Sequence, residues 1–255
     1  MTPGEALAVL GAGLGAGAIN AAVGSGTLIS FPVLLATGMP PVTATVSNAL
    51  GLVPGSISAA IGYRRELAGQ GRRLLRLGAG ALLGGVAGAA LLLALPASVF
   101  EMIVPVLVGL ALVLVVLQPW ISKRLRDRRE RNGKAARPDG GPLLAPGLAL
   151  ASVYGGYFSA AQGIIYMALM GILLDEDMRR LNAIKNVLVA VVNSVAAAFF
   201  LFAAEFDWTA VALLAVGSAV GAQAGAAAGR RLSPAGLRAL IVAVGTTSIV
   251  QLVLR

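Results

Sequence analysis

The chain of 255 residues is 58% hydrophobic, only 12% of its residues are charged, and its mean hydropathy is +0.86. Soluble domains carry about 25% charged residues, so this chain has too few charges to cover a water-facing surface. The net charge is +9, and the basic residues that produce it cluster between the apolar segments. This pattern is typical of the positive-inside signal of membrane proteins and not of a nucleic-acid site. The absence of cysteine and histidine excludes disulfides, Cys/His metal sites and Ser-His catalysis.

Eight apolar runs follow one another along the chain, and about 20 helical residues are enough to cross a bilayer. The runs fall at residues 5–37, 43–63, 74–95, 99–121, 143–174, 181–204, 208–229 and 235–254. The polar segment 122–142 carries eight Lys/Arg and three Asp/Glu, which predicts a flexible, basic cytoplasmic linker. The sequence thus predicts an all-α integral membrane protein with two transmembrane halves, residues 1–121 and 143–255.

The two halves resemble each other at an offset of 137–138 residues. Residues 44–50 align with residues 182–188, and residues 55–63 align without a gap with residues 193–201. The identities are few, but the register holds across most of each half. We interpret this pattern as an internal duplication, which is a hallmark of secondary transporters.

The first run of each half is long and contains residues that favour a helix break. Gly24-Ser25-Gly26 interrupt the first run, and Gln162-Gly163 lie at the matching point of the fifth run. Glycine adopts non-helical dihedrals at little cost, so a break is expected at both places. Each run is then either one long tilted helix or a broken, re-entrant hairpin of two half-helices.

The charge distribution favours the hairpin. If each half is a re-entrant hairpin plus three transmembrane helices, the halves have opposite orientation and 18 of the 20 basic residues fall on the cytoplasmic side. If all eight runs cross fully, the arginines at 179–180 and 230–238 move outside. The positive-inside rule therefore predicts an inverted repeat. The other side then holds Glu5, Glu101, Glu205 and Asp207.

Small residues are spaced four apart in two of the runs. Gly84-x-x-x-Gly88 and Gly217-x-x-x-Gly221-x-x-x-Gly225 place glycines on one helix face, where two helix backbones can approach closely. We expect these faces to pack helices together, and they would also permit a homodimer.

Polar residues at membrane depth are costly and are functional candidates by default. The candidates gather at the two breaks and in the runs that follow them. The predicted substrate-binding residues are Asn20, Gly24, Ser25, Gly26, Ser47, Asn48, Gln162, Gly163, Lys185, Asn186 and Asn193. In an inverted repeat they converge near the bilayer midplane, where broken helices present positive ends that bind anions. Lys185 adds a full charge and no acidic residue lies deep in a run, so we expect an anionic substrate.

Several of these residues have a structural alternative. Lys185 lies about four residues into its span and could snorkel to the headgroups. Asn48 and Asn186 could be hydrogen-bond partners between helices, and Ser25 could bond to its own backbone.

The first half also carries a recognisable pattern. Asn20-Ala-Ala-Val-Gly-Ser-Gly-Thr-Leu is followed by Pro32 and Gly38-Met-Pro-Pro, and then by Ala44-Thr-Val-Ser-Asn-Ala-Leu. With the degenerate second copy, this resembles the sulfite exporter TauE/SafE family of bacterial membrane proteins over nearly the whole chain except the linker. The resemblance implies transport of small sulfur-containing anions such as sulfite or organosulfonates, a location in the inner membrane, and no ATPase domain.

The sequence therefore predicts a secondary transporter that moves a sulfur oxyanion by alternating access. Its partners are the anion and the lipid bilayer, and we expect no cofactor, no metal, no nucleic acid and no enzymatic activity. Two other classes stay open, an anion channel and a non-transporting membrane scaffold. Coupling is open between a proton carried by Lys185, protonation of the substrate, and uniport.

Overall fold

A computed structural model gives the fold and describes residues 1–132, 140–174, 176–228, 242–243 and 246. This part of the chain forms ten helices and no strand. The eighth apolar run, 235–254, lies almost wholly outside the described residues, and Arg230, Arg231 and Arg238 lie outside them entirely.

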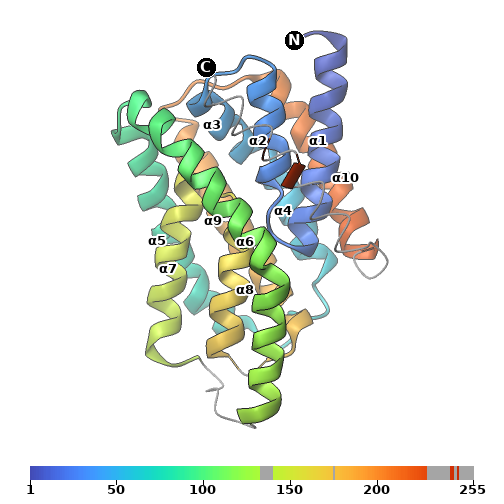
Figure 1. The fold of residues 1–255 in the computed structure, drawn as a ribbon, viewed down its shortest axis with the longest axis vertical. Coiled ribbons are helices and arrows are strands. Elements are labelled where there is room, and N and C mark those ends of the chain that lie inside the picture. Colours follow the sequence, from blue (N-terminus) through green and yellow to red (C-terminus); the bar gives the residue numbers. More distant parts are fainter. Residues whose placement is uncertain (133–139, 175, 229–241, 244–245, 247–255) are drawn as a thin grey trace.

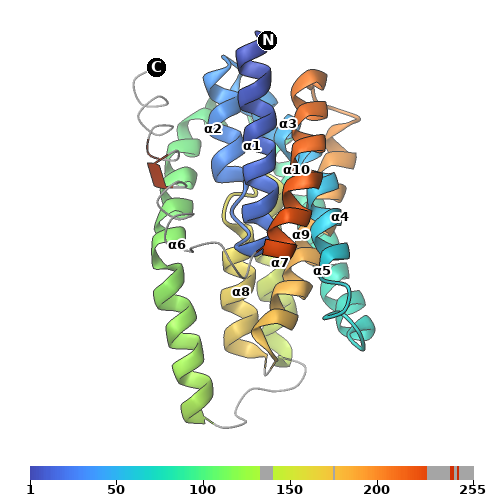
Figure 2. The ribbon, with the colours of Figure 1, turned by 90° about the vertical axis from the view of Figure 1, so that its right-hand side faces the viewer.

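Each of the two long apolar runs consists of two helices joined by a short turn. The helices of the first run are α1 (Pro3–Ala22) and α2 (Thr27–Ala36), and those of the second are α7 (Gly141–Tyr157) and α8 (Gln162–Leu173). In both views of the molecule, α2 turns back beside α1 and α8 turns back beside α7, and the two hairpins enter from opposite ends (Figures 1 and 2). Neither run is therefore one long tilted helix.

The two turns are built differently. The first falls where the sequence predicts it, and Gly24 has a φ of +87°, which glycine adopts without steric cost. The second precedes the predicted position, because Gln162 and Gly163 already begin α8 and residues 158–161 form the turn. There Ser159 and Ala161 take left-handed φ values of 64° and 56°. Such values are uncommon for residues with a side chain. Because neither position is a glycine, the sequence gives no conformational signal for a break at these residues.

The described chain contains six helical stretches long and apolar enough to cross a bilayer, one of which is α1. This is a multi-pass membrane protein. The other five match predicted spans: α3 with α4 (Pro41–Gly51 and Val53–Gly62), α5 (Gly71–Ala94), α6 (Ala97–Asn132), α9 (Met178–Phe200) and α10 (Trp208–Ala228).

Two helices depart from the predicted boundaries. The run 43–63 is interrupted at Leu52, because Pro54 has no N–H to continue the helical hydrogen bonds. Helix α6 continues to Asn132, so residues 122–132 extend the helix and do not form the flexible linker expected there. Lys, Arg and Glu, which dominate this segment, are good helix formers.

The glycine faces pack each hairpin against a helix of the other half. Helix α5 lies along α7, and α10 lies along α1. A Cβ at Gly84 or Gly88 would clash with carbonyl groups of α7, and a Cβ at Gly221 or Gly225 would clash with carbonyl groups of α1. The prediction of close backbone packing is confirmed, and the paired glycines occupy matching positions of the two halves.

The α4–α5 and α8–α9 turns lie at one end of the bundle, and the α2–α3 and α9–α10 turns lie at the other (Figure 1). We call the first the basic end. There Glu176 forms ion pairs with Arg73, which follows the α4–α5 turn, and with Arg180, which follows the α8–α9 turn. At the other, which we call the acidic end, Glu205 and Asp207 lie near the N-terminus and the α2–α3 turn.

We expect Gly88→Ala to lower the free energy of unfolding by about 1–3 kcal/mol, because the new Cβ would push α5 away from the Val153 carbonyl of α7. Gly78→Ala is the control, since it lies in the same helix and its Cβ would meet no atom within 4 Å. Thermal unfolding in detergent measures both variants. Equal stability of the two would contradict the packing.

Candidate functional site

The ends of the two hairpins, which we call the tips and define as residues 22–27 and 158–163, meet in the middle of the protein. The backbone N–H of Gly163 donates a hydrogen bond to the carbonyl of Gly24, with an N···O distance of 3.1 Å. A Cβ added to either glycine would lie 2.5 Å from the Cα of the other, so both positions require glycine. The junction therefore brings together the two breaks that occupy matching positions of the repeat.

Hydroxyl groups bridge the same junction. The Oγ1 of Thr27, the first residue of α2, lies 2.9 Å from the Oγ of Ser159 in the second tip. Asn48 on α3 donates its Nδ2 to the same Thr27 oxygen at 3.3 Å. Helix α3 is thus tied to both tips through a chain of three side chains.

Lys185 of α9 is fully buried and points at the end of α1. Its Nζ donates to the carbonyls of Asn20 at 2.9 Å and Ala21 at 3.3 Å. The amides of Asn182 and Asn186 also donate to the Ala21 carbonyl, each at 3.2 Å. The last carbonyls of a helix carry partial negative charge, so these three side chains cap the C-terminus of α1. The ammonium does not snorkel to the surface.

Buried polar atoms at the junction still lack a partner. Among the described residues, the Oγ of Ser25, the Oδ1 of Asn48 and the Oε1 of Gln162 are buried and accept or donate no hydrogen bond. Unpaired buried polar groups are rare and costly in native proteins. A ligand seated at the tips would satisfy them.

Two predicted site residues face other partners. Ser47 accepts a hydrogen bond from the backbone N–H of Asp207 at 3.1 Å, which ties α3 to the acidic end. Asn193 donates to the Oγ of Ser56 at 3.0 Å, between α9 and α4. The ungapped alignment pairs Ser56 with Ser194, the neighbour of Asn193, and the bonded pair lies away from the tip residues along α4 and α9. The other nine predicted residues lie at or beside the junction.

Tyr166 and Ser152 also belong to this region, although neither is among the predicted site residues. Gln162 donates its Nε2 to the hydroxyl of Tyr166 at 2.6 Å, and that hydroxyl lies 2.6 Å from the Oγ of Ser152. Since Ser152 donates to the carbonyl of Leu148, Tyr166 donates to Ser152. The i,i+4 spacing of Gln162 and Tyr166 is the sequence signal that predicts such a pair.

A cluster of ion pairs and hydrogen bonds around Glu176 lies at the basic end. The carboxylate of Glu176 accepts from Arg73 at 2.7 Å, from Gln70 at 2.9 Å and from Arg180 at 3.1 Å. Burial alone would raise the pKa of Glu176, but the hydrogen bonds from Arg73, Gln70 and Arg180 outweigh it and lower the pKa from 4.5 to about 2. This cluster joins the two halves of the chain.

No metal site is evident in the part of the chain that the structure describes, since no three Asp or Glu side chains gather there. What the junction offers a ligand is hydrogen bonding: backbone at the helix ends, hydroxyls, amides and one buried ammonium. Such a set suits a small polar molecule held without covalent chemistry.

A multi-pass bundle with two broken hairpins and a buried polar junction defines a protein of the membrane-transporter class. The family model of the sulfite exporter TauE/SafE matches residues 9–252, and the chain belongs to this family. The Probable membrane transporter protein YfcA of Escherichia coli (strain K12) is 29% identical over 211 residues, which cover 82% of this chain and 75% of the relative. A Probable membrane transporter protein of Haemophilus influenzae is 28% identical over 208 residues, covering 82% and 78%. No solved structure matches the chain.

We expect Glu176→Gln to lower the free energy of unfolding by about 1–3 kcal/mol near neutral pH, because it removes charge-assisted hydrogen bonds from two arginines. The depressed pKa makes the carboxylate stabilising above pH 4.5, and this contribution is lost as the pH falls towards about 2. The difference in melting temperature between wild type and variant should therefore shrink across this range.

Glu66→Gln is the matched control, since it removes a carboxylate from the neighbouring α4–α5 turn. It should leave the pH profile of the melting temperature close to that of the wild type. A constant difference between Glu176→Gln and the wild type at every pH would refute the proposed role of the charge.

Proposed function

We propose that this protein is a secondary transporter that moves a small anion, such as sulfite, an organosulfonate or a related sulfur oxyanion, across the bacterial inner membrane. The observation that carries this proposal is the junction itself, where two hairpin tips meet beside a buried ammonium and unpartnered polar atoms. Family membership supports the same class of function.

The arrangement of the hairpins supports an inverted repeat. They enter from opposite ends of the bundle, and their tips meet through Gly24 and Gly163. Each is backed by a glycine face of the other half, α10 behind α1 and α5 behind α7. In the membrane the two hairpins would then be re-entrant, with their tips near the midplane. Transporters with inverted repeats bind substrate there, at the ends of discontinuous helices.

Electrostatics favours an anion. Helices α2 and α8 begin at the junction with no side chain capping their first N–H groups, so two positive helix ends face the tips. The negative end of α1 is offset by Lys185. None of the 11 acidic residues lies in α2, α3, α8, α9 or the two tips. The net field at the junction is therefore positive, and helix N-termini are ready-made anion sites.

The same geometry supports a mechanism of alternating access. The tips meet in the middle of the bundle, so substrate reaches them from one side at a time only if the hairpins and the helices that follow them move against the rest. A channel would need a continuous wet pore past the tips, and a scaffold would need no buried charge. The closed junction of Gly24 and Gly163 favours the transporter over both. No enzymatic activity is proposed, because the junction offers binding groups and no catalytic constellation.

The proposal is tested with purified protein in liposomes, by flux of sulfite, sulfoacetate, sulfate and chloride. Lys185→Met should reduce anion flux at least about ten-fold, because charge-assisted hydrogen bonds contribute about 1.5–3 kcal/mol. Lys185→Arg, which keeps the charge, should retain more flux than Lys185→Met.

Lys123→Met is the matched control, since it removes an exposed positive charge from the far end of α6 and should leave flux unchanged. Absence of flux for every anion in the wild type would refute the transporter. Wild-type flux in Lys185→Met would remove the lysine from the site.

A further inference from the structure

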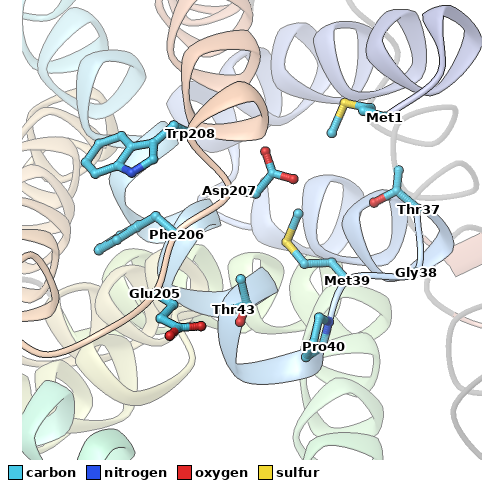
Figure 3. Close-up of a pocket in the computed structure, with 10 residues that line it drawn as sticks. All are labelled: Met1, Thr37, Gly38, Met39, Pro40, Thr43, Glu205, Phe206, Asp207 and Trp208. Atoms are coloured by element: carbon cyan, nitrogen blue, oxygen red, sulfur yellow. The ribbon is translucent and has the colours of Figure 1, made fainter.

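A cavity of about 480 Å³ opens at the acidic end (Figure 3). It lies between the α2–α3 turn and the α9–α10 turn, and the side chains of Met39, Thr43 and Asp207 point into it. Nothing in the function proposed so far uses this cavity.

Helix α3 runs from the cavity towards the hairpin tips. Thr43 lines the cavity, and Asn48 lies five residues further along the same helix, about 7.5 Å deeper at 1.5 Å per residue. Asn48 donates to Thr27 of the first tip, and Thr27 contacts Ser159 of the second. The cavity is therefore separated from the tips by about one and a half helical turns of α3.

A second, smaller cavity of about 50 Å³ reaches the tips from another direction. Ala22 and Val23 of the first tip and Ile164 of α8 line it. Its other walls include Met178, which begins α9 next to the basic end. The tips thus border the smaller cavity directly, whereas five residues of α3 separate them from the cavity at the acidic end.

Few hydrogen bonds join one tip directly to the other. One backbone hydrogen bond and one hydroxyl pair join tip to tip. By contrast, glycine faces bring backbones together along α1 with α10 and α5 with α7. A movement that parts the tips can therefore leave both helix pairs intact.

We propose that the cavity at the acidic end is the mouth of the transport path, and that the junction of Gly24, Thr27, Ser159 and Gly163 is the gate that closes it. This inference rests on the proposed transport function. The anion enters or leaves through the mouth, and the gate opens when the two hairpins separate.

A cysteine pair tests the gate, because the chain contains no cysteine of its own. The hydroxyl oxygens of Thr27 and Ser159 are 2.9 Å apart, so sulfurs at these positions can form a disulfide after a small shift. Oxidation of the double variant Thr27→Cys/Ser159→Cys in liposomes should reduce anion flux at least about ten-fold, and a thiol reductant should restore it. The two single variants are controls and should not respond to oxidant.

Thiol labelling tests the mouth independently of disulfide formation. A charged, membrane-impermeant methanethiosulfonate added on both sides of the membrane should modify Thr43→Cys and reduce flux at least about three-fold. Ser98→Cys is the matched control, since Ser98 is exposed at the start of α6 and does not line the cavity. It should be modified without loss of flux.

The outcomes separate the two levels of the proposal. Absence of flux in the unmodified wild type would overturn the transport function itself. Normal flux in the wild type together with full flux through the cross-linked pair would overturn the gate. If the disulfide does not form, full flux through modified Thr43→Cys, or resistance of this residue to the reagent, would overturn the path.

Discussion

Contact between the backbones of Gly24 and Gly163 is the constraint on which the rest of the structure depends. Two chains can approach this closely only where both residues lack a side chain, since a Cβ on either would lie 2.5 Å from the other Cα. The approach places two helix starts, the end of α1 and the ammonium of Lys185 in one small volume. A polar centre inside an apolar bundle follows from this geometry.

Helix ends organise that centre more than side chains do. The last carbonyls of α1 are matched by Lys185, Asn182 and Asn186, so the negative end of this helix is neutralised inside the protein. The starts of α2 and α8 have no side-chain cap. Lys185 therefore acts first as the partner of the C-terminal end of α1. By neutralising that negative end, it leaves the positive N-terminal ends of α2 and α8 free to attract an anion.

The outer parts of the bundle hold the centre in place. Glycine faces fix α1 on α10 and α5 on α7, while Glu176 links the two halves at the basic end through Arg73 and Arg180. Phe158 of the second tip packs edge-on against Phe31 of α2, with ring centroids 5.2 Å apart. The glycine contacts therefore hold each hairpin along its first helix, and ring packing supports the second tip.

The sequence by itself determined the membrane location, the helical class, the first break, and several of the polar residues found at the junction, although Thr27 and Ser159 were not among those predicted. These follow from local properties, namely hydropathy, glycine conformational freedom and the cost of burying polar groups. Only the tertiary structure decided which of them meet. Ser47 and Asn193 are neutral, polar and buried like Asn48 and Asn186, but they bond to Asp207 and Ser56 away from the tips. The second break falls at residues 158–161, where Ser159 and Ala161 take left-handed conformations that local sequence does not predict for residues with a side chain, so only the tertiary structure located it.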